Sequence, residues 1–186
     1  MPLPIEITDY NPRWPDSFAV VRDRLAHVLG VLTHRIEHVG STAVPGLPAK
    51  PVIDIDVVIR TRDDLPAVIA RLQAAGYHHR GDLGITGREA LHTPPNTPAH
   101  HLYVCAADNP ELERHLRFRD VLRTHPQTAQ AYAALKRSLA AKFRTNRDAY
   151  TESKTTFIEQ VLAKAIADVE SQGHSTALSA RRTDPP

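Results

Sequence analysis

The chain has 186 residues, and its 23 lysine and arginine residues against 21 aspartate and glutamate residues give a formal net charge of +2 at pH 7. This length suits one domain, and a content of 41% hydrophobic and 24% charged residues excludes a chain that is disordered throughout. The single cysteine excludes an internal disulfide framework and a multi-cysteine zinc site.

The charge and the hydropathy pattern also limit the partners. A net charge of +2 is too small to indicate nucleic acid binding by itself. No apolar run approaches the roughly 20 residues that cross a membrane, and residues 1–10 lack the basic start and apolar stretch of a signal peptide. We therefore expect a cytoplasmic protein without a membrane partner. The 11 histidines stand out, because imidazole titrates near neutral pH and often binds metals.

The first half of the chain mixes helices and strands. Hydrophobic spacing predicts a helix over residues 15–29, and a short strand follows over residues 36–40. Three prolines make residues 42–51 a loop, whereas β-branched residues make 52–59 the strongest predicted strand. A second helix is expected between Asp63 and Gly76.

The next segment, residues 77–91, is rich in glycine and is expected to form two short strands with a turn. A loop over residues 93–99 and a strand over residues 101–105 follow. The pattern then becomes helical after Pro110, with the last and longest helix running from about Tyr150.

These elements predict one domain over residues 1–170, followed by a disordered tail over residues 171–186 that lacks hydrophobic periodicity. One helix, strands interleaved with a second helix, and then three helices make an α+β (α/β) domain with a helical C-terminal half.

The chemistry is expected at two aspartates in the strongest strand. Asp54 and Asp56 are two residues apart, so both side chains lie on one face, while Ile53, Ile55 and Val57 face the core. Two neighbouring carboxylates repel each other, and a divalent cation would offset their charge. Carboxylate oxygens suit Mg²⁺ or Mn²⁺, which orient triphosphates and neutralise charge in nucleotidyl transfer.

A glycine–serine turn precedes this strand. Gly40 permits a phosphate close to the backbone, and the hydroxyl groups of Ser41 and Thr42 can donate to phosphate oxygens. Taken alone, each feature has an ordinary explanation: the segment is only a turn, and the aspartates face water on an edge strand. Together they match the Gly-Ser then Asp-x-Asp pattern of the nucleotidyltransferase superfamily.

Over roughly residues 5–166 the chain closely resembles the GrpB family. The resemblance implies a nucleotidyltransferase-like fold with a small mixed β-sheet flanked by helices, and the family also occurs as a domain appended to dephospho-CoA kinase. The segments that carry it are Arg35–Leu47, Ala49–Asp56, Gly84–Arg88, His101–Val104 and His115–Asp120, with Tyr150, Lys154, Phe157 and Ile158 in the last helix.

One feature departs from active nucleotidyltransferases, which usually carry a third carboxylate on a neighbouring strand. The strand expected to hold it contains no acid. Glu89 is the nearest alternative, and His38 and His101 are the histidines expected beside the aspartates. Ligation by either histidine would favour another divalent metal over Mg²⁺.

Basic residues complete the predicted site. Lys50 lies between the glycine–serine turn and the acidic strand, and Arg88 follows a glycine turn, so each is expected to bind phosphate. The arginines between Arg114 and Arg123 either form a solvated helix face or bind a polyanion.

The leading hypothesis is a metal-dependent nucleotidyltransferase-like enzyme that acts on or binds a nucleoside triphosphate and an unknown acceptor. Because the third carboxylate is missing, the alternative is a non-catalytic domain that binds a nucleotide, a CoA-like ligand or a partner protein. RNA binding through the arginine-bearing helix is a weaker third hypothesis.

Overall fold

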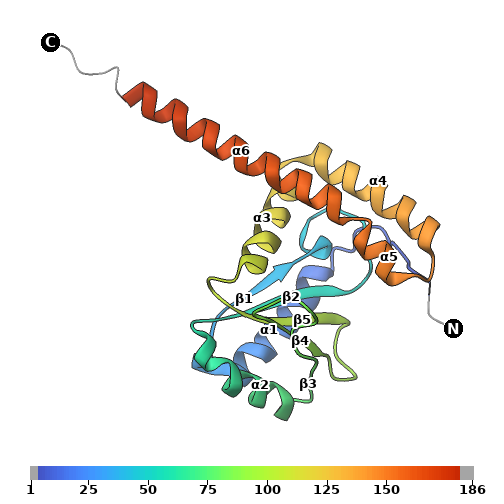
Figure 1. Ribbon diagram of the computed structural model, residues 1–186. Coiled ribbons are helices and arrows are strands. Elements are labelled where there is room, and N and C mark those ends of the chain that lie inside the picture. The colour runs from blue at the N-terminus through green and yellow to red at the C-terminus, as the bar shows by residue number, and fades with distance from the viewer. Residues whose placement is uncertain (1–3, 181–186) are drawn as a thin grey trace.

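The computed structural model describes the backbone of residues 4–180 and the side chains of residues 4–168 (Figure 1). Its centre is a five-stranded sheet in the order β1-β2-β5-β4-β3. β2 and β5 are parallel, and the other neighbours are antiparallel. The strands are β1 (Thr33–Val39), β2 (Ile53–Ile59), β3 (His78–His79), β4 (Arg88–His92) and β5 (His100–Ala106).

Helices cover both faces of this sheet. Two precede β3 and four follow β5, and none within the described residues is long and apolar enough to span a membrane. The helices are α1 (Trp14–Leu29), α2 (Leu65–Ala74), α3 (Pro110–Thr124), α4 (Pro126–Phe143), α5 (Arg147–Glu152) and α6 (Thr155–Ala180), with a short 3₁₀ turn, η2, at Ser41–Ala43.

The first face of the sheet packs against α1 and α2. Ile53, Ile55 and Val57 of β2 are buried there with Leu25 of α1 and Leu72 of α2. Strand alternation sends every second side chain of β2 to this core. The remaining side chains of β2 therefore face the opposite side of the sheet, which fixes the position of Asp54 and Asp56.

The second face packs against α3 at one end only. Val58 and Cys105 are buried there with Leu112 of α3. A separate cluster joins Val44 and Leu47, from the loop after η2, to Tyr132 of α4 and neighbouring side chains of α3 and α6. The helical half thus lies over the sheet face that carries the aspartates (Figure 1).

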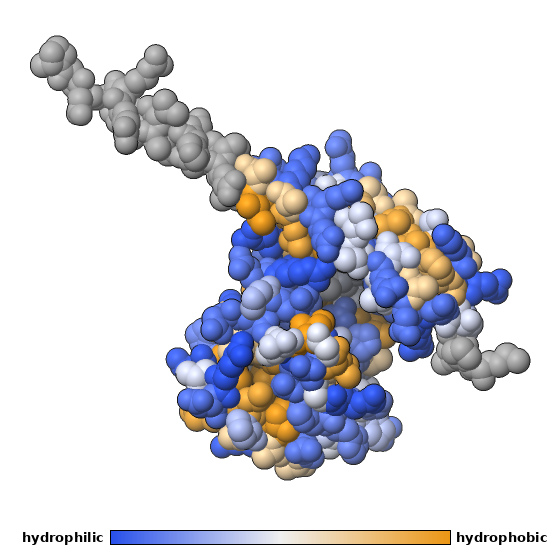
Figure 2. All heavy atoms as spheres, viewed as in Figure 1, coloured by the Kyte–Doolittle hydropathy of each residue, from blue (hydrophilic) through white to orange (hydrophobic). Residues whose placement is uncertain are grey.

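α6 crosses this helical layer and continues away from the rest of the chain (Figure 1). It extends beyond residue 170, where the domain was expected to end, and residues 181–186 of the expected tail lie outside the described residues. Figure 2 shows a largely hydrophilic surface in the same view, with a hydrophobic patch on α6 near the point where it leaves the body.

The predicted fold class is confirmed, and two elements differ in detail. β1 begins at Thr33 rather than at residue 36. The long last helix expected from Tyr150 is two helices, because α5 ends at Glu152 and α6 begins at Thr155. Asn146 caps α5 by accepting from the backbone N–H of Ala149, and Tyr150 is buried against the N-terminal Ile5. The break turns the chain and brings Lys154 to the cavity described below.

Removing core volume from the central strands should destabilise the protein strongly. Leu102 of β5 is 1% exposed within the core between the sheet and α1, so Leu102→Ala should lower the free energy of unfolding by about 2–5 kcal/mol. The matched change Val20→Ala, at a side chain 62% exposed, should change it by less than about 0.5 kcal/mol. Urea unfolding of both variants measures the difference, and equal effects would contradict this assignment of the core.

Candidate functional site

A cavity of about 440 Å³ lies between the second face of the sheet and the helical half. Seven of the ten residues predicted for the site line this cavity, and Asp56, Glu89 and His38 do not. The seven are Gly40, Ser41, Thr42, Lys50, Asp54, Arg88 and His101. Residues far apart in the sequence, from the glycine–serine turn to β5, therefore meet at one surface.

The turn after β1 is held against the acidic strand by a close contact. Gly40 has a φ of 70°, and a Cβ atom added there would lie 2.2 Å from Oδ2 of Asp54. Only glycine satisfies both the left-handed backbone and this approach. The contact places the backbone of Gly40 and the start of η2 directly beside the carboxylate of Asp54.

Each aspartate accepts a hydrogen bond from a histidine. Nδ1 of His101, on β5, donates to Oδ1 of Asp54 at 2.8 Å, and Nδ1 of His115, on α3, donates to Oδ2 of Asp56 at 2.7 Å. Burial lowers the pKa of His115, but the hydrogen bond and the charge of Asp56 outweigh that effect and raise the pKa above its ordinary value. The hydrogen bond from His115 thereby offsets part of the cost of burying the charge of Asp56.

Asp56 is 1% exposed, and its second oxygen, Oδ1, is buried without a hydrogen-bond partner among the described residues. A buried carboxylate oxygen normally has a donor or a cation beside it. The pair Asp54 and Asp56 therefore fits a divalent cation chemically. No group of three or more histidine, cysteine, aspartate or glutamate side chains within the described residues is arranged to hold one.

The sheet register explains the missing third carboxylate. His101 lies opposite Asp54 and Tyr103 lies opposite Asp56 on β5, so neither position supplies an acid. Glu89 does not replace it. It pairs with Val104 in register, which puts it on the first face of the sheet, and Oε2 accepts from Nε2 of His79 at 2.6 Å.

His38 was also expected beside the aspartates, but it does not line the cavity. It lies opposite Ile55 on β1, so it faces the α1 side, and its ring stacks on Phe18 with the centroids 4.6 Å apart. Burial lowers its pKa to about 4, so it is neutral at pH 7. Its Nε2 lies 3.0 Å from Oγ1 of Thr42, which orients the hydroxyl group in the turn.

Sequence reasoning missed the contributions of the helical half. Glu111, His115, Lys136 and Lys154 all lie at the cavity. Glu111 and His115 are four residues apart on α3, and Oε1 of Glu111 lies 3.6 Å from Nε2 of His115. That spacing signals proximity on a helix, but no local pattern indicates that α3 and Asp56 meet.

Four cations at the cavity have no carboxylate within ion-pair distance among the described residues. The amino groups of Lys50 and Lys154 lie 5.1 Å and 4.6 Å from the ring centre of Tyr150. Lys136 donates to Oγ of Ser41 at 3.0 Å and also to the carbonyl oxygen of Pro48. The fourth cation is Arg88, whose guanidinium lies 4.3 Å from the ring centre of Tyr103.

Lys50, Lys136 and Lys154, here called the lysine cluster, lie close enough for neighbouring positive charges to disfavour their charged forms. Burial lowers the pKa of Lys136 to about 7 and that of Lys154 to about 8, and the neighbouring lysine charges add to both shifts. Burial also lowers the pKa of Lys50. Asp54 acts in the opposite direction on all three but does not offset the loss of hydration. An anion bound among these amines would restore their charged forms.

The arginines of α3 are neutralised within the protein. Arg114 pairs with Glu111, Arg117 with Glu113, and Arg119 with Glu37. Arg123 lies 3.4 Å from Asp120. These ion pairs favour the interpretation of a solvated helix face over that of a polyanion-binding one.

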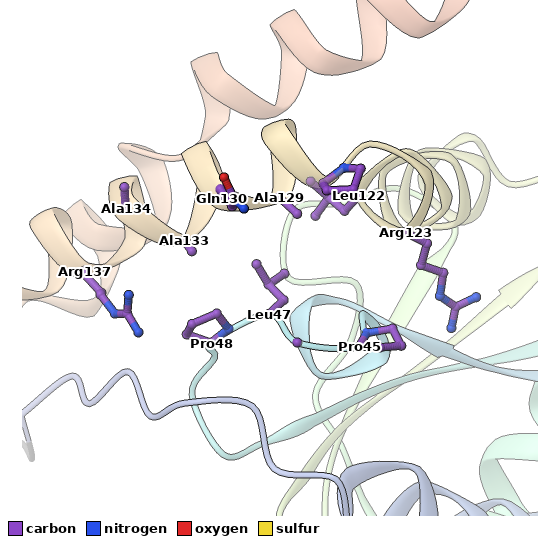
Figure 3. A pocket seen from close by; sticks show the side chains of 12 residues that line it. Pro45, Leu47, Pro48, Leu122, Arg123, Ala129, Gln130, Ala133, Ala134 and Arg137 are labelled. Atoms are coloured by element: carbon purple, nitrogen blue, oxygen red, sulfur yellow. The ribbon is translucent and has the colours of Figure 1, made fainter.

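A second cavity, of about 480 Å³, lies between the loop over residues 45–48 and α4 (Figure 3). Its lining is mostly apolar, with Leu47 facing Ala133 and Arg123 and Arg137 at opposite ends (Figure 3). Arg137 pairs with Asp9, and Arg123 donates to the carbonyl oxygen of Ala43. No acid lines this cavity, so the candidate site is the one that contains Asp54.

Comparisons with known proteins agree with the resemblance in the sequence. The family described as GrpB protein matches residues 4–164. The UPF0157 protein YqkA of Bacillus subtilis is 37% identical over 155 residues, which cover 83% of this chain and 45% of YqkA. The crystal structure of GrpB from Enterococcus faecalis has a TM-score of 0.79 at 33% identity, covering 88% of this chain and 99% of that one.

A dephospho-CoA kinase of Mycolicibacterium paratuberculosis is 26% identical over 197 residues, which cover 91% of this chain and 48% of that protein. The chain thus spans about half the length of YqkA and of this kinase.

The contact between Gly40 and Asp54 can be tested against a glycine with the same backbone. Gly40→Ala should destabilise the protein by several kcal/mol, because strain at positive φ adds to a clash at 2.2 Å. Gly46→Ala has a φ of 77° but no atom within 4 Å of its added Cβ, so it should cost only about 1 kcal/mol. Urea unfolding compares the two, and equal costs would show that the contact is unimportant.

Burial of Lys136 should appear in the pH dependence of stability. Its pKa in the folded protein, about 7, lies below the unfolded value, so the unfolded chain binds more protons above pH 7 and stability rises with pH in that range. Lys136→Met should reduce the rise in free energy of unfolding between pH 7 and pH 9, whereas the exposed Lys142→Met should keep it. An unchanged rise in Lys136→Met would contradict this interpretation.

Proposed function

The chain belongs to the GrpB family, and we propose that its cavity binds a nucleoside triphosphate and transfers the nucleotidyl group to an acceptor in a metal-dependent reaction. One observation carries the proposal: cations without carboxylate partners line the same cavity as Asp54, and the buried Asp56 lies two residues further along the same face of β2. The negative charge of a polyphosphate would pair with the cations at the cavity, and a divalent cation would pair with the aspartates.

In this proposal the lysine cluster and the turn hold the phosphate groups. Lys136 already contacts Ser41, so one amine and one hydroxyl group can share a phosphate oxygen. Gly40 brings the start of η2 beside the carboxylate of Asp54, and Thr42 is held in place by His38. Tyr132 and Tyr150 give the lysines an aromatic wall that limits their hydration.

Asp54 and Asp56 would hold the cation, with Mg²⁺ or Mn²⁺ favoured by their oxygen ligands. When bound, such a cation neutralises charge on the phosphate oxygens and orients the nucleotide. The ring of His101 lies beside Asp54, and ligation by its nitrogen would favour another divalent metal over Mg²⁺.

The proposed reaction is a substitution at the α-phosphorus. A hydroxyl oxygen of the acceptor forms a bond to this phosphorus, and the bond from the phosphorus to the oxygen bridging to the β-phosphate breaks. Pyrophosphate leaves with the electron pair, and the hydroxyl proton passes to solvent. The lysine cluster stabilises the charge that develops on the leaving pyrophosphate.

A second candidate is a domain that binds the same ligand without turnover. It is favoured by Tyr103, which occupies the register position opposite Asp56, and by the two histidines that already engage the aspartates. Formation of pyrophosphate by the wild type would exclude this candidate, whereas binding without turnover would favour it.

Titration calorimetry with α,β-methylene-ATP, with and without Mg²⁺ or Mn²⁺, tests the proposal. Asp54→Asn and Asp56→Asn should each weaken metal-supported binding by about tenfold or more, because one charged ligand is worth about 1.4 kcal/mol or more. Glu89→Gln is the matched control, since it removes a carboxylate on the other face of the sheet and should bind like the wild type. Unchanged binding in both aspartate variants would overturn the proposal.

A further inference from the structure

We propose that the acceptor is itself a phosphorylated small molecule, and that Arg88 binds its phosphate on the side of the aspartates opposite to the lysine cluster. This inference rests on the proposed function and names the chemical class of the second substrate. It is carried by the placement of Arg88 in the sheet and by its lack of a counter-charge.

The two cationic groups lie on different sides of β2. The lysine cluster adjoins the turn that follows β1, through the bond from Lys136 to Ser41, and β1 is one neighbour of β2. Arg88 lies on β4, which is separated from β2 by β5. Two strand spacings place its backbone about 10 Å from β2, and the guanidinium lies over Tyr103, the residue opposite Asp56.

Arg88 forms no ion pair among the described residues, and each neighbouring acid is paired through one oxygen, although Oδ1 of Asp56 has no hydrogen-bond partner. Asp54 accepts from His101, Asp56 accepts from His115, and Glu111 pairs with Arg114. Nε of Arg88 is buried and has no hydrogen-bond partner among the described residues. A guanidinium that lines a cavity without an ion-pair partner among the described residues is suited to an anion from outside, and its planar fork matches phosphate.

The direction of the transfer explains why this anion belongs to the acceptor. In phosphoryl-type substitution the attacking oxygen and the leaving oxygen lie roughly in line through the phosphorus. If the lysine cluster holds the leaving pyrophosphate, the attacking hydroxyl group must approach from the other side of Asp54 and Asp56. Arg88 lies on that side, so a phosphate bound to it would hold the acceptor in the line of attack.

The test separates the two anion positions with two probes. The full chain is saturated with α,β-methylene-ATP and Mg²⁺, and binding of radiolabelled inorganic phosphate is followed by equilibrium dialysis. The wild type should bind phosphate together with the nucleotide. Arg88→Met should weaken phosphate binding by about tenfold and nucleotide binding by a smaller factor, whereas Lys154→Met should show the reverse order.

Two further variants keep the result decisive. The exposed Arg80→Met removes an arginine close in the sequence and should bind both probes like the wild type. Arg88→Lys keeps the charge without the planar fork, so it should bind phosphate more weakly than the wild type even if Arg88→Met fails to fold.

Competition between phosphate and the bound nucleotide, or equal weakening of both probes by Arg88→Met and Lys154→Met, would overturn the acceptor position while leaving nucleotide binding in place. Failure of the wild type to bind the nucleotide at all would instead overturn the proposed function.

Discussion

The arrangement of the molecule depends on two carboxylates carried by the most buried strand of the sheet. β2 lies between β1 and β5, and its alternate side chains form the core with α1 and α2. Placing Asp54 and Asp56 on the other face leaves negative charge where hydration is poor. Three features surround these carboxylates. A glycine allows the backbone to approach, two histidines donate hydrogen bonds to the carboxylates, and the helical layer places lysines at the cavity.

The helical half does more than cover the sheet. Several cations of α3 have a carboxylate partner, such as Arg117 with Glu113 and Arg119 with Glu37. The cavity instead concentrates cations that have no carboxylate partner among the described residues, and burial lowers the pKa of Lys136 to about 7 and that of Lys154 to about 8. Sites that bind anions tightly often hold such uncompensated charge in the empty state, because ligand binding then relieves the cost.

Local patterns predicted the elements that position the acidic pair. Alternation along 52–59 placed both aspartates on one face, and the glycine–serine turn was placed beside them. The same period of two also explains why Glu89 and His38 do not line the cavity, because each lies one residue out of phase with the site and faces the first side of the sheet. His115 and Lys136 could not be placed, because their contacts with Asp56 and Ser41 depend on how α3 and α4 pack over the sheet. That packing leaves no periodic signal near either residue.

The break between α5 and α6 has a consequence for when the site can form. Tyr150 anchors α5 against Leu139 and the N-terminal Ile5, and the turn that follows delivers Lys154 to the cavity. The acidic side of the cavity is therefore encoded before residue 60, and two of its three lysines are encoded after residue 135. During synthesis, a chain that has emerged only as far as α3 carries the carboxylates without these two lysines. The complete anion site therefore forms only after α4 and α5 have been synthesised, when Ile5 can pack against Leu139 and Tyr150.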